Sequence, residues 1–111
     1  MWLVRGNDVL ASLEVARSGA ERRRGLLGRD GIEGALLLRP ARSVHTLGMR
    51  FAIDVAHLDA DGTVLRVTTM QPWRLGAVVL SARSVVEAEA GSFARWGVTL
   101  GDVLEVKGGE S

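Results

Sequence analysis

The chain has 111 residues, with 14 basic and 13 acidic side chains, 47% hydrophobic residues and no cysteine. A chain of this length is typical of one domain that buries its own core, so we expect a single domain over residues 1–111. The lack of cysteine excludes disulfides, zinc–thiolate sites and thiol nucleophiles, and no apolar run approaches the ~20 residues of a membrane-spanning helix.

Charge is distributed unevenly along the chain. Residues 1–50 contain nine arginines and five acidic residues, whereas residues 51–111 contain five basic and eight acidic residues. The balance indicates a polar molecule without specific nucleic-acid binding. Because Arg5 and Asp8 interrupt the N-terminal apolar residues, the start of the chain does not have the pattern of a signal peptide. We therefore expect a cytoplasmic protein without membrane insertion.

The first predicted elements are a strand, a short helix and a second strand. Apolar and polar residues alternate over 8–16, which predicts a half-buried strand. Ser18 and Glu21 have the spacing of a capping box, and Gly28 is placed to end the helix in the left-handed conformation. The run "ALLLRP" (35–40) predicts a buried strand that ends at its proline.

A hairpin is predicted in the middle of the chain. The strand-like runs 51–59 and 63–70 flank the sequence Asp-Ala-Asp-Gly, and a short Asp-Gly connection between two such runs is a strong hairpin signal. A further strand is predicted over 83–90, after the loop "QPWRLG".

The last predicted elements are a short helix and a strand. Residues 91–97 form the helix, with Ser92 as N-cap and Gly97 at its end, and residues 103–107 form the strand. Together these elements predict a mainly β fold, α+β by content, with two short helices.

Both histidines lie in the segment 45–62, which raises the question of a metal site. His45, Asp54 and His57 are ligand types, but strand alternation places Asp54 and His57 on opposite faces. We therefore expect no metal and no cofactor. His57 is predicted to be a buried strand histidine with hydrogen-bonded ring nitrogens.

Asp54 is unusual because the residues beside it on the same strand face, Ala52, Ala56 and Leu58, are all apolar. A buried carboxylate is costly unless it is paired or hydrogen-bonded. Two interpretations stay open at this point. Asp54 either binds a structural partner, such as an arginine or backbone amides of residues 45–50, or it faces a ligand.

Two further motifs bear on function. The nucleophile motif Gly-x-Ser-x-Gly of serine hydrolases is absent, and we assign no catalytic residue. Trp73 and Arg74 lie together in the loop "QPWRLG". An exposed tryptophan beside an arginine suits a sugar or a protein partner, although Trp73 could equally cover an open sheet edge.

The order of several segments resembles the domain of unknown function 192 family of bacteria and archaea. These segments are "ERRRGLLGR" (21–29), "GALLLRP" (34–40), "FAIDVAHLDADGTVLRV" (51–67) and "SVVEAEAGSFARWGVTLGDVLEV" (84–106). The resemblance implies a small β-sandwich, roughly jelly-roll-like, with short helices, and no established activity. Many relatives have a Trp-Met-Lys-Asn-Thr-like segment where this chain has "HTLGM" (45–49), so the contacts of that segment do not transfer.

Three functions are compatible with these residues. The first is a non-catalytic binding module for a small polar ligand, with carbohydrate as one candidate; its predicted site residues are His45, Thr46, Met49, Asp54, Trp73 and Arg83. The second is a protein-interaction or assembly component that binds a protein partner through Trp73 and Arg74. The third, which we rank last, is an enzyme with His45 as base and Asp54 as its orienting group.

Overall fold

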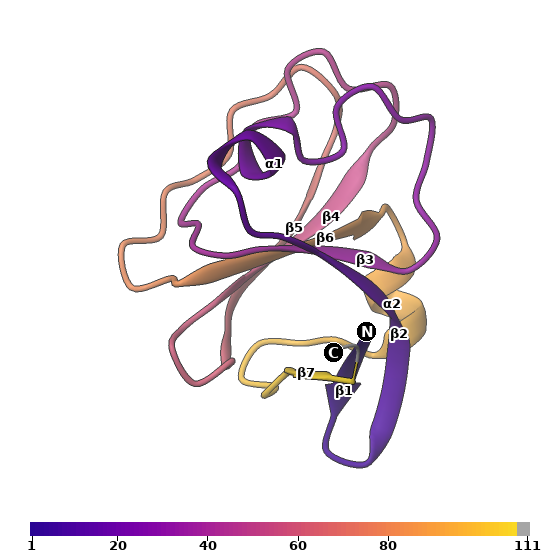
Figure 1. Cartoon of the computed structure of the whole chain (residues 1–111), viewed down its shortest axis with the longest axis vertical. Coiled ribbons are helices and arrows are strands. Elements are labelled where there is room, and N and C mark those ends of the chain that lie inside the picture. Colours follow the sequence, from indigo (N-terminus) through magenta and orange to yellow (C-terminus); the bar gives the residue numbers. More distant parts are fainter. Residues whose placement is uncertain (109–111) are drawn as a thin grey trace.

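The computed structural model describes residues 1–108, which form seven strands and two short helices (Figure 1). In chain order these elements are β1 (Trp2–Arg5), β2 (Asp8–Ala16), α1 (Gly19–Arg24), β3 (Ala35–Leu38), β4 (Ile53–Leu58), β5 (Val64–Met70), β6 (Ser84–Glu89), α2 (Ser92–Trp96) and β7 (Glu105–Lys107). Strand β1 was not predicted. No helix in this part of the chain has the length and apolar character needed to cross a membrane.

The strands form one mixed sheet in the order β5-β4-β6-β3-β2-β1-β7. Within residues 1–108, only β2 and β3 pair in parallel, and α1 lies in the connection between them, as a parallel pair requires a crossover. Residues 8–12 of β2 pair with β1, and residues 13–16 pair with β3. Strand β2 therefore continues from the central strands to β1 and β7.

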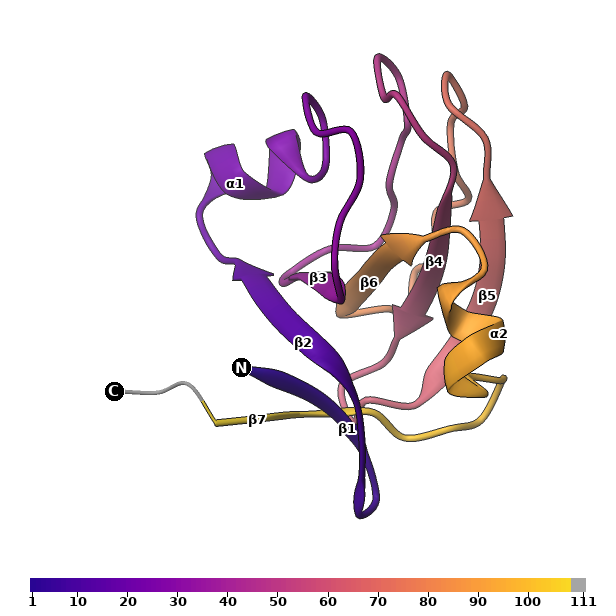
Figure 2. The ribbon, with the colours of Figure 1, turned by 90° about the vertical axis from the view of Figure 1, so that its right-hand side faces the viewer.

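The sheet bends along β2, so that β1 and β7 lie below the central strands (Figures 1 and 2). The mainly β fold with two short helices is confirmed. Its sandwich-like shape arises from the bending of one sheet, which leaves one side open.

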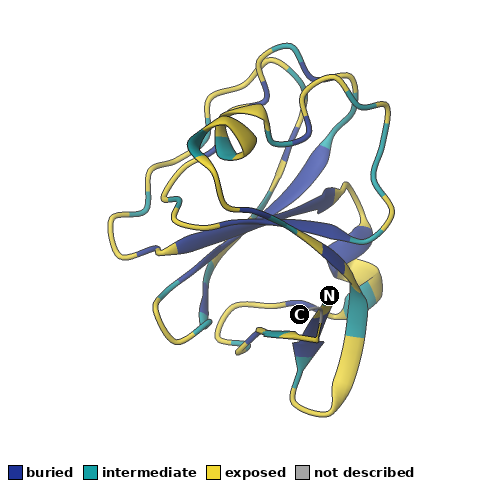
Figure 3. Cartoon of the chain, in the orientation of Figure 1, coloured by how far each residue is buried: buried dark blue, intermediate teal, exposed yellow. Residues whose placement is uncertain are grey.

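The central strands are buried along most of their length (Figure 3), and each face of the sheet has its own hydrophobic core. The first core includes Leu3 of β1, Leu37 of β3 and Phe93 of α2. The second core lies on the other face, where Leu26 and Met49 from the 25–51 region cover the central strands. Polar residues within the central strands therefore face one of two separate buried layers.

The local predictions for α1 are confirmed at its start and wrong at its end. The Ser18 hydroxyl accepts from the Glu21 amide at 3.0 Å, and the Glu21 carboxylate accepts from the Ser18 amide at 2.9 Å. The helix ends at Gly25 and not at Gly28, because the Gly25 amide donates to the Glu21 carbonyl and φ turns to +48° there.

The β4–β5 hairpin is confirmed. Asp59 holds its turn, since one carboxylate oxygen accepts from the Asp61 amide at 2.9 Å and from the Thr63 amide at 3.0 Å. Gly62 follows with a φ of +85°, and its carbonyl accepts from Leu104, which leads into β7. The turn is therefore also a contact point for the C-terminal strand.

Candidate functional site

The hydrogen bonds of the Asp54 carboxylate are made to other residues of the protein. Its carboxylate accepts from the Thr69 hydroxyl at 2.7 Å and from the amides of Gly91 and Phe93 at 3.0 Å each. Helix α2 has Gly91 as N-cap and lacks a cap from its own side chains, so the predicted N-cap role of Ser92 is wrong. Asp54 supplies the missing acceptor. The predicted partners in residues 45–50 are also wrong, because the amides come from the start of α2.

The register between β4 and β6 determines which face of the sheet Asp54 and Glu87 occupy. Asp54 lies opposite Ala88, which belongs to the first core. Its neighbour Val55 belongs to the second core and lies opposite Glu87. Asp54 and Glu87 therefore point to opposite faces. His45 lies on the Glu87 side of the sheet and so cannot form the His45–Asp54 catalytic pair.

His57 is buried in the second face of the sheet, at 1% exposure. Neither ring nitrogen has a hydrogen-bond partner of normal geometry among residues 1–108, although backbone groups of Ala77 and Arg42 lie close to the ring, so the predicted hydrogen bonding of the ring is not confirmed. Burial lowers the pKa of His57, and the nearby Ala77 backbone only partly opposes that effect. His57 is therefore held as a neutral core residue.

Thr46 joins two of the predicted site loops. Its amide donates to the Arg74 carbonyl at 2.8 Å, and its hydroxyl donates to the Gln71 carbonyl at 2.6 Å while accepting from the Arg74 amide at 2.9 Å. The Trp73 amide donates to the Thr46 carbonyl at 2.8 Å. Thr46 is fully buried, so its hydroxyl positions the Trp73–Arg74 turn.

The remaining predicted site residues are dispersed. The Trp73 side chain is 66% exposed, and its φ of +65° is uncommon for a residue other than glycine. Met49 packs in the second core. Arg83 is exposed and lines a separate hollow beside Arg42. The structure brings together His45, Thr46 and Trp73, but it does not gather the predicted six residues around one cavity.

Glu87 is the polar residue that the sequence interpretation missed. Strand β6 places it between Leu36 on β3 and Val55 on β4, within the second buried layer. It is only 3% exposed, and its Oε1 atom has no hydrogen-bond partner among the described residues. Burial raises the pKa of Glu87 to about 7. A buried carboxyl group without a partner is costly to keep.

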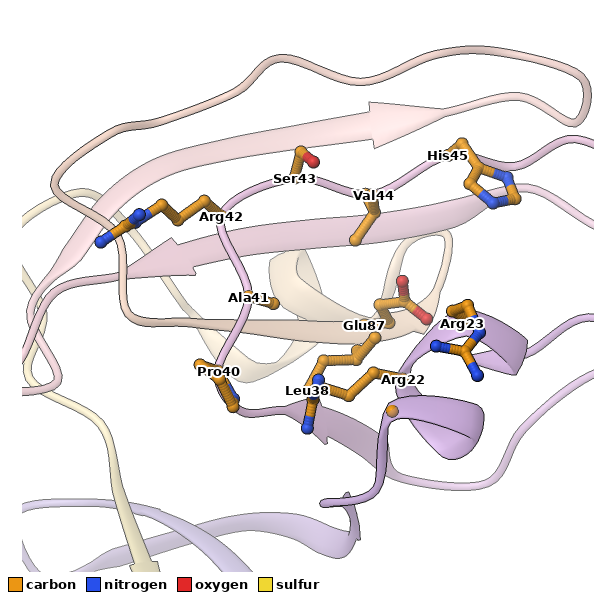
Figure 4. A pocket seen from close by; sticks show the side chains of 11 residues that line it. Arg22, Arg23, Leu38, Pro40, Ala41, Arg42, Ser43, Val44, His45 and Glu87 are labelled. Carbon is orange, nitrogen blue, oxygen red and sulfur yellow. The ribbon is translucent and has the colours of Figure 1, made fainter.

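A pocket of about 360 Å³ lies over Glu87 (Figure 4). Its walls are α1, with Gly19, Arg22 and Arg23, and the segment 38–45. Figure 4 shows the Glu87 carboxyl group pointing toward the part of the pocket where Arg23 and His45 lie. His45 Nδ1 accepts from the Leu47 amide at 3.2 Å, which leaves Nε2 as the other polar atom of its ring. His45 is thus the one predicted site residue in this pocket.

The side chains that line this pocket are suited to binding a ligand. A buried carboxyl group can accept a hydrogen bond from a ligand, and the arginines of α1 can receive a negatively charged group. A signal for Glu87 existed in the sequence, since "SVVEAEA" places a glutamate inside a strand of small and β-branched residues, as "FAIDVA" does for Asp54. Only the position of β6 between β3 and β4 shows that this glutamate is buried.

Comparison with known proteins agrees with this fold. A UPF0127 protein of Pyrococcus furiosus is 30% identical over 108 residues, which cover 93% of both chains. A second UPF0127 protein, from Pyrococcus abyssi, is 30% identical over 98 residues, or 84% of both chains.

Two solved structures have the same fold. One is a protein of unknown function from Novosphingobium aromaticivorans, with a TM-score of 0.81, 22% identity and coverage of 94% of this chain and 82% of that one. The other, from Sinorhizobium meliloti, carries the provisional name of a transcription regulator, with a TM-score of 0.71, 24% identity and coverage of 84% and 79%. At these identities the likeness concerns the fold alone.

The family comparison covers nearly the whole chain. The sequence profile of DUF192, described as an uncharacterized ACR, matches residues 3–106. The resemblance noted in the sequence is thereby confirmed, and the chain belongs to the domain of unknown function 192 family.

Proposed function

We propose that the protein is a binding module for a small polar ligand, and that this ligand occupies the pocket over Glu87. The observation that supports the proposal is the buried carboxyl group itself, which lies at a pocket and has an oxygen atom without a partner among residues 1–108. A buried polar group left without a hydrogen bond costs roughly 1–3 kcal/mol, and a ligand hydroxyl or amino group would restore that bond.

The size and lining of the pocket support the same proposal. A volume of about 360 Å³ falls in the range of small-ligand sites. Leu38, Pro40 and Val44 provide an apolar wall, while Glu87, His45 and the arginines provide a few polar groups. A sugar ring presents hydroxyl groups and apolar faces together, so carbohydrate remains a candidate ligand.

A thermal-shift screen against sugars, nucleotides, short peptides and divalent metals tests this proposal. A ligand at about 100 times its dissociation constant adds about 2.7 kcal/mol to folded-state stability, which moves the midpoint clearly. We expect a stabilising ligand whose effect is lost in Glu87→Leu and weakened in Glu87→Gln. Glu89→Gln is the matched control, because Glu89 lies two residues further along β6 but is exposed and outside the pocket.

A second candidate function is binding of a protein partner through the loop that contains Trp73 and Arg74. Four large apolar side chains of this loop are exposed: Trp73 at 66%, Leu75 at 78%, Val78 at 64% and Leu80 at 78%. Apolar surface concentrated in one segment is a feature of interaction sites. Under this proposal, the double change Trp73→Ala and Arg74→Ala abolishes co-purification of a partner, whereas Trp2→Ala, at a distant exposed tryptophan, does not.

A further inference from the structure

We infer that the ligand of the Glu87 pocket is a small anion with a hydroxyl or amino group next to its charged group. The charged group would bind Arg23, and the hydroxyl or amino group would donate to Glu87. This inference rests on the proposed function, because it assigns a chemical class to the ligand of the same pocket.

The charge of the pocket favours an anion. Its lining includes three arginines, Arg22, Arg23 and Arg42, but only one acidic residue, Glu87. Two of these arginines already bind backbone carbonyls: Arg22 donates to Arg17 and Arg42 donates to Ala82. Within residues 1–108, Arg23 forms no ion pair. Arg23 is therefore the guanidinium group best placed to receive an anionic group from a ligand.

The backbone around Arg23 leaves room for this contact. A Cβ atom at Gly19 would lie 3.2 Å from Arg23 Nη1, so a larger residue at this position would require the guanidinium group to shift by a few tenths of an ångström. Gly19 lines the pocket together with Arg23. The first residue of α1 thus allows the Arg23 side chain to lie along the pocket wall.

The hydrogen-bond donor of the ligand is inferred from the Glu87 carboxyl group. A Cβ atom at Gly25 would lie 3.4 Å from Glu87 Oε1, in contact with this oxygen. This oxygen is buried and has no hydrogen-bond partner among residues 1–108, so a donor group of the ligand would supply the missing bond. Arg23 and Glu87 lie in the same pocket but do not form an ion pair with each other. A ligand that contacts both must contain an anionic group and a hydrogen-bond donor.

The test uses two matched sets of probes. NMR titration of the full chain measures the dissociation constant of each probe. Propionate, lactate and alanine share a three-carbon skeleton and present a carboxylate alone, with a hydroxyl group or with an ammonium group. Glucose and glucuronate differ at carbon 6, which is a hydroxymethyl group in glucose and a carboxylate in glucuronate. We expect lactate or alanine to bind at least tenfold more tightly than propionate, and glucuronate at least tenfold more tightly than glucose. Whether lactate or alanine binds better identifies the donor group.

Variants assign the two contacts. We expect Arg23→Ala to weaken binding of the preferred anion at least fivefold. Arg24→Ala, a change at the next exposed arginine of α1, should leave binding unchanged because Arg24 is outside this pocket. Glu87→Leu should remove the preference for lactate or alanine over propionate.

Three outcomes would overturn the inference. Equal binding of propionate, lactate and alanine would show that no donor group is recognised. Glucose binding as tightly as glucuronate, without an effect of Arg23→Ala, would show that no anion is recognised, and the proposed function would then survive with a neutral ligand. Absence of binding by every probe, glucose included, would overturn the inference alone; the proposed pocket function fails only if the thermal-shift screen also yields no ligand whose effect depends on Glu87.

Discussion

At the scale of single residues, the Glu87 carboxyl group couples folding to proton binding. Burial raises its pKa from an ordinary 4.5 to about 7. Between these values the folded state binds more protons than the unfolded state, so stability falls as pH rises from 4.5 to 7. The size of the effect is about 3 kcal/mol. We expect Glu87→Gln to be more stable than the wild type at pH 8 by up to this amount, and not at pH 4.5.

Urea unfolding of both proteins at pH 4.5, 6 and 8 measures this difference. Glu89→Gln serves as control, because this exposed carboxylate lies on the same strand. The same pH dependence in the wild type and Glu87→Gln would show that Glu87 is not a buried proton-binding group.

His57 has the opposite dependence on pH. Its pKa is lowered by burial, so below pH 6.5 the unfolded state takes up a proton that the folded state excludes, and stability falls with decreasing pH. His57→Leu removes this titration and two buried nitrogens that lack hydrogen bonds of normal geometry among residues 1–108. We expect a gain of about 1 kcal/mol or more. Thermal unfolding should show a larger gain in stability at pH 5 than at pH 7.5. A gain that does not change with pH would show that His57 does not titrate in this way.

At the scale of elements, Asp54 connects β4, β5 and α2. Asp54→Ala would leave the Gly91 and Phe93 amides and the Thr69 hydroxyl without their acceptor. We expect a loss of about 3 kcal/mol, against about 1 kcal/mol for Thr69→Val, which removes a single bond. Urea unfolding measures both losses, and hydrogen exchange should show faster exchange at the Phe93 amide. A stable Asp54→Ala variant that loses ligand binding would assign Asp54 to a functional site instead.

The contact between the β4–β5 turn and the segment leading to β7 can also be tested. A Cβ atom at Gly62 would lie 2.3 Å from the Leu104 carbonyl oxygen, and φ is +85°. Gly101 has a similar φ of +87° with nothing within 4 Å of such a Cβ atom. Gly101→Ala should therefore cost about 1 kcal/mol of backbone strain. We expect Gly62→Ala to cost at least twice as much in urea unfolding, because it also displaces the segment leading to β7.

At the scale of the whole molecule, the sequence predicted contacts between near neighbours and missed those between distant ones. The capping box and the Asp59 turn were predicted because all their atoms lie within four residues of each other. The cap of α2 was missed because Asp54 and Gly91 are 37 residues apart. Glu87 was missed for the same reason, since its burial depends on β3, β4 and α1 together. His45 was the one predicted site residue that lies in the Glu87 pocket.

The two cores should unfold together, because β2 pairs with strands that belong to both. Residues 8–12 pair with β1 and residues 13–16 with β3, so loss of either core removes a neighbour of β2. We expect Leu3→Ala in the first core and Leu26→Ala in the second each to lower global stability by about 2–4 kcal/mol. Each variant should show a single transition by both far-ultraviolet circular dichroism and tryptophan fluorescence. If the two probes separate in either variant, the two cores unfold independently, and the pocket over Glu87, which lies on the side of the second core, opens without disturbing β1 and β7.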